Sequence, residues 1–95
     1  MTLRVVLRPE ALAELEEARA WYEERDLGLG EEFYRCVEAV VEGARRSPDQ
    51  YPCVHGEVRR GLVRRFPYGV FYMVTDDTIV ILAVFHASRD PAGWR

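Results

Sequence analysis

A change in apolar spacing halfway along the chain constrains its fold more than any other feature. Within residues 33–44 the apolar side chains have the spacing of one helical face: Phe33, Val37, Val40 and Ala44. Further on, the pattern changes to two continuous apolar runs, VFYMV at residues 70–74 and IVILAVF at residues 79–85. Such runs are typical of central strands that are covered on both faces. The sequence therefore predicts helices followed by a sheet.

The helical part is expected to be a hairpin over residues 9–47. Pro9 and Glu10 suit the first turn of a helix. The apolar stripe of this first helix is Ala11, Leu15, Ala18 and Tyr22. Two glycines in DLGLG (residues 26–30) break the helix, and Ser47–Pro48 ends the second one. The acidic side chains of both helices are expected to face solvent.

The remaining segments supply the strands. Residues 3–8 are rich in β-branched side chains and predict a first strand. Residues 48–56 predict a proline-bearing loop, residues 58–66 a strand of mixed polarity, and TDDT (residues 75–78) a tight hairpin between the two apolar runs. The expected fold is α+β, in the order β-α-α-β-β-β, with the helical hairpin packed on a mostly antiparallel four-stranded sheet.

Length and composition limit the function classes. Ninety-five residues correspond to a single domain, which we expect to span residues 1–95. No apolar run approaches the roughly 18 residues of a membrane span, and the first residues lack a signal-peptide core, so a cytoplasmic protein is expected. Cys36 and Cys53 are too few for a disulfide framework, and neither a metal site nor a cofactor is expected.

Arginines are concentrated in one short segment of an acidic chain. The net charge is −3 and lysine is absent, yet Arg59, Arg60, Arg64 and Arg65 fall within seven residues. In a continuous strand, alternation places Arg59 and Arg65 on one side and Arg60 and Arg64 on the other. Two interpretations stay open at this point: a solvated edge strand blunted by charge, or a binding surface.

Three segments carry a resemblance to the RelE/ParE toxin superfamily. They are AWYEER…GLGEEF in residues 20–33, VRRGLVRRFPYGVFYMV in residues 58–74 and VFHASRDPAGWR in residues 84–95. The chain looks closest to the ParE-like plasmid stabilisation branch of these bacterial toxins. The resemblance implies the toxin component of a type II toxin–antitoxin module, neutralised by a cognate antitoxin in a toxin–antitoxin hetero-oligomer.

The resemblance implies one of two activities. RelE-like toxins cleave mRNA on the ribosome, and for that chemistry the candidate catalytic residues are His86, Arg89 and Arg65. Histidine ordinarily titrates near neutral pH, which suits proton transfer, and Glu57 or Tyr72 would be further candidates. The chain departs from the RelE pattern, however, because it has no lysine and has Gly69 where an arginine is expected. A structural histidine is the alternative interpretation of His86.

ParE-like toxins instead bind DNA gyrase and inhibit it, and this is the favoured hypothesis. The target-binding candidates are Arg59, Arg65, Tyr68, Arg89 and Trp94, because arginines and large aromatic side chains dominate binding energy at interfaces. The acidic overall charge also argues against tight nonspecific nucleic-acid binding. Trp94 has an alternative role as a cap on the core, and Phe71 and Tyr72 are expected in the core.

Overall fold

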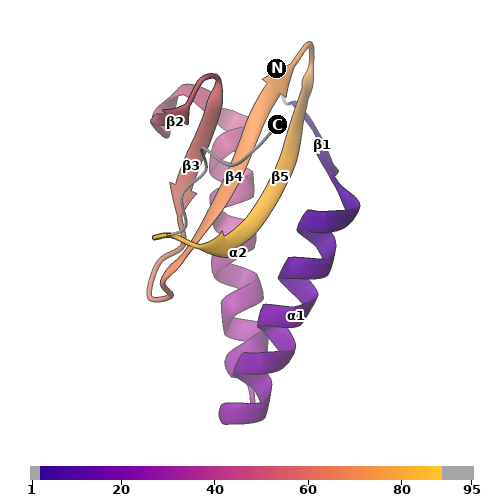
Figure 1. The fold of residues 1–95 in the computed structure, drawn as a ribbon, viewed down its shortest axis with the longest axis vertical. Helices are drawn as coiled ribbons and strands as arrows, with labels where there is room; N and C mark the ends of the chain where they lie inside the picture. Colours follow the sequence, from indigo (N-terminus) through magenta and orange to yellow (C-terminus); the bar gives the residue numbers. More distant parts are fainter. Residues whose placement is uncertain (1–2, 89–95) are drawn as a thin grey trace.

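The computed structural model describes residues 3–88, which form two helices on one five-stranded sheet (Figure 1). The elements in chain order are β1 (Arg4–Leu7), α1 (Pro9–Arg25), α2 (Leu29–Arg46), a short 3-10 helix (Pro48–Gln50), β2 (Cys53–His55), β3 (Val58–Leu62), β4 (Tyr68–Thr75) and β5 (Thr78–His86). The helical hairpin extends past the strands, so that the α1–α2 connection forms one end of the molecule.

The sheet has the order β1-β5-β4-β3-β2 and is mostly antiparallel. Only the β1–β5 pair among the described strands is parallel, with Val5 opposite Ile79. The predicted α+β order is therefore confirmed. The sheet has one strand more than the four expected, because β2 lies within the predicted loop and pairs with the start of β3 through Cys53 and Arg59. A three-residue strand is too short to show a period of two in the sequence.

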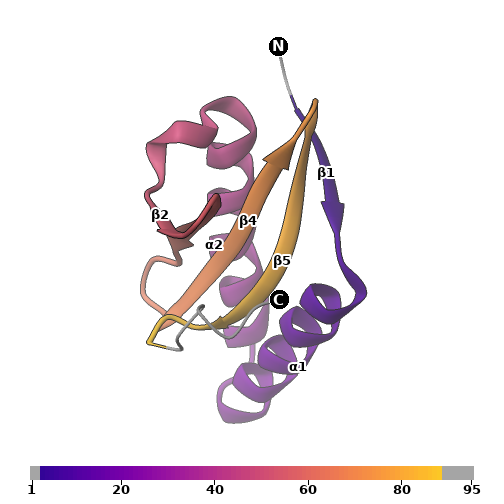
Figure 2. The ribbon, with the colours of Figure 1, turned by 45° about the horizontal axis from the view of Figure 1, so that its top comes forward.

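Both helices pack on the same face of the sheet (Figure 2). The core between the layers contains the predicted helical stripes together with the inward side chains of β4 and β5, and its largest fully buried members include Phe33, Tyr72 and Ile81. Phe71 is also fully buried, so the expectation that Phe71 and Tyr72 belong to the core is confirmed. The opposite face of the sheet has a smaller apolar cluster of Val58, Phe71, Ala83 and Phe85.

The tight connection between α1 and α2 explains why Glu23, Gly28 and Gly30 occur in the segment AWYEER…GLGEEF (residues 20–33). The Glu23 carboxylate accepts hydrogen bonds from the backbone N–H groups of Gly28 at 2.8 Å and Gly30 at 2.9 Å. Gly28 has a left-handed φ of 89°, which glycine adopts without strain. Gly30 lies so close to α1 that a Cβ atom there would be 2.5 Å from the carbonyl oxygen of Arg19. Glu23 thus caps α2 from within α1.

The arginine-rich strand is shorter than predicted. β3 ends at Leu62, and a turn leads into β4, closed by a hydrogen bond from the Val63 N–H to the Tyr68 carbonyl at 2.9 Å. Val63 and Phe66 are both buried in the core on the helix side, which strict alternation along residues 58–66 does not allow. The predicted strand over residues 58–66 was therefore wrong in its second half. Arg64 and Arg65 belong to the turn.

Within residues 3–88, no helix has both the length and the apolar character required to cross a membrane.

Candidate functional site

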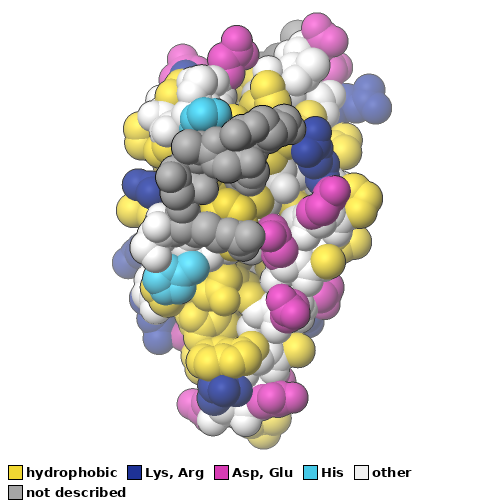
Figure 3. Space-filling model, in the orientation of Figure 1, with side chains coloured by type: hydrophobic (Ala, Val, Ile, Leu, Met, Phe, Trp, Pro, Cys, Tyr) yellow, Lys and Arg dark blue, Asp and Glu magenta, His cyan; other side chains and the backbone are white. Residues whose placement is uncertain are grey.

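One groove lies between α1 and the adjoining ends of β4 and β5. It has a volume of roughly 660 Å³ and is lined by Glu14, Glu17, Ala18, Trp21, Tyr22, Pro67, Tyr68, Val84, Phe85 and His86. We call it the aromatic groove. Figure 3 shows hydrophobic side chains gathered on the lower part of this face, with acidic side chains beside them on the α1 side.

Tyr22 connects the wall of the aromatic groove to the core. Its ring lies 4.9 Å from that of Phe66, 5.1 Å from that of Phe33 and 6.1 Å from that of Tyr68, measured between centroids. The pKa of Tyr22 is raised above its usual value. The main cause is burial of the hydroxyl, and the second is the nearby Tyr68. The ring network fixes Tyr22 and Tyr68, so a ligand would meet rigid aromatic surface rather than flexible side chains.

Trp21 extends this surface toward the end of the helical hairpin. Its ring packs edge-on against Tyr22 with centroids 5.1 Å apart, and 49% of its surface stays exposed. The Arg25 guanidinium lies 3.5 Å from the centroid of the indole, which is a cation–π contact. A half-exposed tryptophan supported from two sides is a typical anchor of protein interfaces.

The opposite wall joins α1 to β5. The Glu14 carboxylate accepts a hydrogen bond from the backbone N–H of Val84 at 2.9 Å. β1 pairs with β5 only as far as Ile81, so at Val84 no strand of the described chain lies beside this edge of β5. Glu14 supplies the missing acceptor there. Glu17 follows on the same helix, which makes the charge of this wall negative.

His86, a candidate catalytic residue, is the last residue of β5. Its Nδ1 lies 2.8 Å from the Ser88 hydroxyl oxygen, and its ring lies 6.0 Å from that of Tyr68. From the far face of the sheet, Arg60 donates a hydrogen bond to the Ala87 carbonyl at 3.1 Å. Arg60 passes beside Gly69, where a Cβ atom would be 3.1 Å from Arg60 Cγ. The Gly69 departure noted in the sequence thus leaves room for this arginine.

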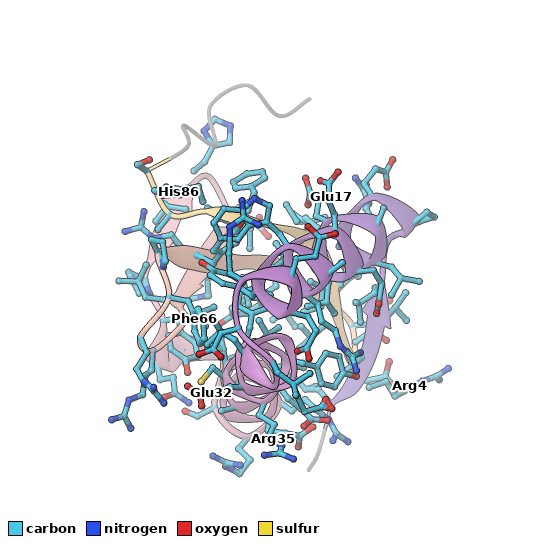
Figure 4. The ribbon with its side chains drawn as sticks, turned by 90° about the horizontal axis from the view of Figure 1, so that it is seen from below. Arg4, Glu17, Glu32, Arg35, Phe66 and His86 are labelled. Atoms are coloured by element: carbon cyan, nitrogen blue, oxygen red, sulfur yellow. The ribbon has the colours of Figure 1, made fainter. Side chains whose placement is uncertain are left out.

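The structure separates the remaining candidates instead of gathering them in one patch. The Arg59 guanidinium donates to the carbonyls of Tyr51 and Asp49 and holds the segment before β2. Arg65 forms an ion pair with Glu32 of α2, with 2.7 Å between Nη1 and Oε1. In Figure 4, His86 and Glu17 lie on one side of the molecule and Glu32 on the other. Arg65 and His86 therefore do not share a site.

Three further candidates have other outcomes. Arg89 and Trp94 lie outside the described residues. Tyr72 is fully buried, and its hydroxyl donates to the Pro48 carbonyl at 2.7 Å, so it is not available for proton transfer at the surface. Burial raises the pKa of Tyr72 to about 12. Among residues 3–88, no group of three or more histidine, cysteine or acidic side chains is placed to hold a metal ion.

Sequence reasoning missed Trp21, Glu14 and Arg60 as members of this region. Trp21 occupies a helical position between two core positions, Ala18 and Tyr22, and a half-exposed aromatic at such a place is the signal that was available. Nothing in the sequence pairs Glu14 with Val84, which lies 70 residues away.

Comparison with known proteins agrees with this fold. Residues 5–91 match the family described as "ParE toxin of type II toxin-antitoxin system, parDE". A solved structure titled "Chromosomal ParDE TA system from P. aeruginosa" superposes with a TM-score of 0.73 at 16% sequence identity, covering 90% of this chain and 96% of that chain. No curated protein matches the sequence. Because the family match spans nearly the whole described chain, the protein belongs to the ParE toxin family of the RelE/ParE superfamily.

Proposed function

We propose that the protein is a toxin that binds DNA gyrase and inhibits it, and that a cognate antitoxin neutralises it in the cytoplasm. In this proposal the chain acts as one domain over residues 1–95, without a cofactor. The observation that carries the proposal is the chemistry of the aromatic groove, which suits a protein surface better than a phosphate backbone.

The lining of the aromatic groove supports protein binding. Trp21, Tyr22 and Tyr68 offer large rigid rings, the residue types that contribute most to binding energy at interfaces. The acidic residues that line the groove are Glu14 and Glu17, and no arginine is among its described lining residues, although Arg25 stacks on the Trp21 ring beside it. Carboxylates repel phosphates, whereas they attract arginine and lysine side chains of a protein partner. Membership of the ParE toxin family points to the same class of activity.

Ribosome-dependent cleavage of mRNA is the second candidate, and one contact favours it. The Ser88 hydroxyl holds the His86 ring at Nδ1, and Arg60 binds the carbonyl of the adjacent residue, Ala87, from the far face of the sheet. This arrangement resembles the general acid or base and the cation that such chemistry needs. Glu14 and Glu17 weigh against this activity, because an incoming RNA strand would pass close to their negative charge.

One pair of assays separates the two candidates. Purified protein is tested for inhibition of DNA supercoiling by gyrase and for cleavage of mRNA on programmed ribosomes, each with the wild type and His86→Gln. We expect inhibition of supercoiling by both proteins and no cleavage by either. Cleavage that falls about a hundredfold in His86→Gln, the usual scale for loss of an acid or base, would overturn the gyrase proposal in favour of the nuclease.

The antitoxin has its own test. Coexpression with the product of the adjacent reading frame should give a copurifying complex whose melting temperature rises with antitoxin concentration, because binding to the folded state stabilises it. An adjacent product that neither copurifies nor stabilises the chain would contradict the toxin–antitoxin assignment of this protein.

A further inference from the structure

The helical spacing of α1 shapes the middle of the aromatic groove. The residues of this helix that line the groove and share one of its faces are Glu14, Glu17, Ala18 and Trp21. Ala18 has the smallest side chain of this set and is only 4% exposed. A short alanine between longer side chains leaves a hollow on this face of α1. The hollow therefore has an apolar floor, with acidic and aromatic side chains around it.

Aromatic rings form part of the wall of this hollow. Trp21 belongs to α1, and Tyr68 is the first residue of β4. Tyr22 connects the two, because its ring centroid lies 5.1 Å from that of Trp21 and 6.1 Å from that of Tyr68. The face of an aromatic ring carries partial negative charge and attracts a cation within about 6 Å of its centroid. The rings thus favour a positively charged ligand over a neutral one.

The chain itself shows that the Trp21 ring accepts a guanidinium. Arg25 lies one helical turn after Trp21, with its guanidinium carbon 3.5 Å from the centroid of the indole. The same guanidinium donates to the Trp21 carbonyl at 3.3 Å and pairs with Glu24 at 4.0 Å. The charge of Arg25 therefore has its own partners. Because 49% of the surface of Trp21 stays exposed, the indole has room for a second cation.

Glu17 supplies a negative charge next to that exposed surface. Its side chain is exposed and forms no ion pair within residues 3–88. Glu17 precedes Trp21 by one helical turn, a spacing at which the Cβ atoms of two residues lie roughly 6 Å apart. Figure 4 shows Glu17 on the same side of the molecule as His86, which also lines the groove. A cation in the hollow can therefore contact the carboxylate and the indole together.

The shape of the cation decides between arginine and lysine. A guanidinium is planar, so it can stack on an aromatic ring while its edge donates hydrogen bonds to a carboxylate, often in bidentate geometry. It is also more weakly hydrated than an ammonium group, which lowers the cost of leaving water for a partly buried hollow. Arginine thus fits Glu17 and Trp21 at once, whereas lysine offers them a compact and strongly hydrated charge.

We propose that the aromatic groove contains a binding site for one arginine side chain, between the carboxylate of Glu17 and the exposed ring of Trp21, and that the protein target supplies this arginine. Only the source of the arginine rests on the proposed function. The guanidinium stacks on the indole and donates to Glu17, and the methylene groups of the arginine cover Ala18. The target is therefore recognised through an arginine on its surface.

The first experiment uses the protein alone and three small probes. The sequence has two tryptophans, so Trp94→Phe assigns the two indole N–H signals in the NMR spectrum of isotope-labelled protein. The probes are Nα-acetyl-arginine amide, its neutral isostere Nα-acetyl-citrulline amide, and Nα-acetyl-lysine amide. The variant is Glu17→Gln, which removes the charge and keeps the size. The matched control is Glu10→Gln, because Glu10 is an exposed acid of α1 that does not line the groove.

We expect the arginine probe to shift the Trp21 indole signal saturably, with equal affinity for the wild type and Glu10→Gln. Its affinity for Glu17→Gln should be about threefold or more lower, because the ion pair is lost. The citrulline probe should bind the wild type about tenfold or more weakly, because it has no charge for either partner. Equal affinities of the arginine and citrulline probes would overturn the proposal, as would equal affinity of the arginine probe for the wild type and Glu17→Gln. Tighter binding of the lysine probe would overturn the choice of arginine.

Trp21→Leu separates ring chemistry from simple apolar contact. Leucine keeps an apolar side chain at this position and removes the π face, so the arginine probe should bind about threefold or more weakly. Binding is followed through the backbone signals of Tyr68 and His86, and circular-dichroism melts establish that each variant is folded. An unchanged affinity for Trp21→Leu would show that the guanidinium does not stack on the indole.

The second experiment asks where the arginine comes from. In the gyrase supercoiling assay, Glu17→Gln should inhibit about threefold or more weakly than the wild type, and Glu10→Gln should inhibit equally well. Inhibition by Glu17→Gln at the wild-type dose would overturn the target as the source. Arg89, which follows Ser88 in the sequence, is the alternative source within this chain. Tighter binding of the arginine probe to Arg89→Gln than to the wild type would likewise overturn the target as the source.

The two experiments keep the arginine site and the proposed function apart. A wild-type protein that does not inhibit gyrase at all would remove the proposed function. The probe measurements need no gyrase, so they would still decide whether the aromatic groove binds arginine.

Discussion

The Glu14 carboxylate accepts a hydrogen bond of 2.9 Å from the backbone N–H of Val84, which lies 70 residues further along the chain. The contact lies where β1 turns away from β5: the Arg8 N–H donates to the Ile81 carbonyl at 3.0 Å, and α1 then takes over the edge of β5. The Glu14 side chain thus takes the place of the β1 backbone as the hydrogen-bonding partner of β5. Because Glu14 also lines the aromatic groove, the contact sets the position of one wall relative to the other.

Replacing Glu14 by alanine tests this contact. The Val84 N–H would lose its acceptor at a partly buried position, and an unsatisfied group of this kind costs about 1–3 kcal/mol. We expect the free energy of unfolding, measured by urea titration, to fall by that amount. Glu17→Ala on the next turn is the control and should change it by less than about 0.5 kcal/mol. Equal effects of the two substitutions would show that the Glu14–Val84 bond does not stabilise the fold.

Glu23 predicts a dependence of stability on pH. Hydrogen bonds from the Gly28 and Gly30 N–H groups lower the pKa of its carboxyl below the ordinary value of 4.5. A carboxyl with a lower pKa in the folded state stabilises the fold above the unfolded pKa, and this contribution disappears as the pH falls through the folded pKa. Glu23→Gln should therefore melt at a lower temperature than the wild type near neutral pH. The difference should shrink as the solution is acidified below about pH 4.

Glu24→Gln is the matched control for Glu23→Gln. Glu24 is the next residue of α1, and its side chain is largely exposed. Within residues 3–88 its only ion pair is with Arg25, at 4.0 Å. Its substitution should leave the melting curve and its pH dependence close to those of the wild type. A melting difference between wild type and Glu23→Gln that stays constant from neutral to acid pH would show that the charge of Glu23 does not cap α2.

The regular part of the fold was predictable because local patterns determine it. Pro9 at the start of α1 and the glycines after Arg25 mark the first helix at both ends, and the structure has α1 over Pro9–Arg25. The apolar runs likewise gave the positions of β4 and β5. The strand predicted over residues 58–66 ran too far, because Val63 and Phe66 both turn to the core and only the tertiary fold reveals this reversal.

The candidate site was predictable only in part. Tyr68 and His86, which were candidates for two different activities, are opposite each other in the β4–β5 register. Arg59 and Arg65 were grouped by alternation along one strand, and the turn at residues 63–67 separates them. Trp21 joins the groove through packing of α1 against β5, a long-range contact that spacing along one helix does not encode.

Substitution of Gly61 should destabilise the protein, because there is no room for a larger side chain at this position. A Cβ atom at this position would be 2.4 Å from Val40 Cγ1 and 3.4 Å from the Tyr51 ring. Gly61→Ala therefore overfills the contact between β3 and α2, and the free energy of unfolding should fall by about 1–3 kcal/mol. The measurement is a double-mutant cycle with Val40→Ala, which removes the clashing methyl groups.

The cycle decides whether the clash is the cause. The double variant Gly61→Ala with Val40→Ala should be more stable than the sum of the single effects predicts, with a coupling of at least about 0.5 kcal/mol. Strict additivity would mean that Gly61 is required for another reason, such as the path of the β3 backbone.

Trp21 should be the anchor through which the aromatic groove holds its target. Its indole is half exposed, and Tyr22 and Arg25 hold it from two sides, so little ordering is needed on binding. Trp21→Ala should weaken inhibition of gyrase supercoiling by about 2 kcal/mol, the scale of an interface hot spot. Leu27→Ala is the control: Leu27 is 92% exposed in the connection between the helices and does not line the groove, so its loss should leave the inhibition constant unchanged. Dose–response curves for the three proteins, with melts to verify folding, measure both effects. Wild-type inhibition by Trp21→Ala, or equal losses in the two variants, would place the gyrase contact outside the aromatic groove.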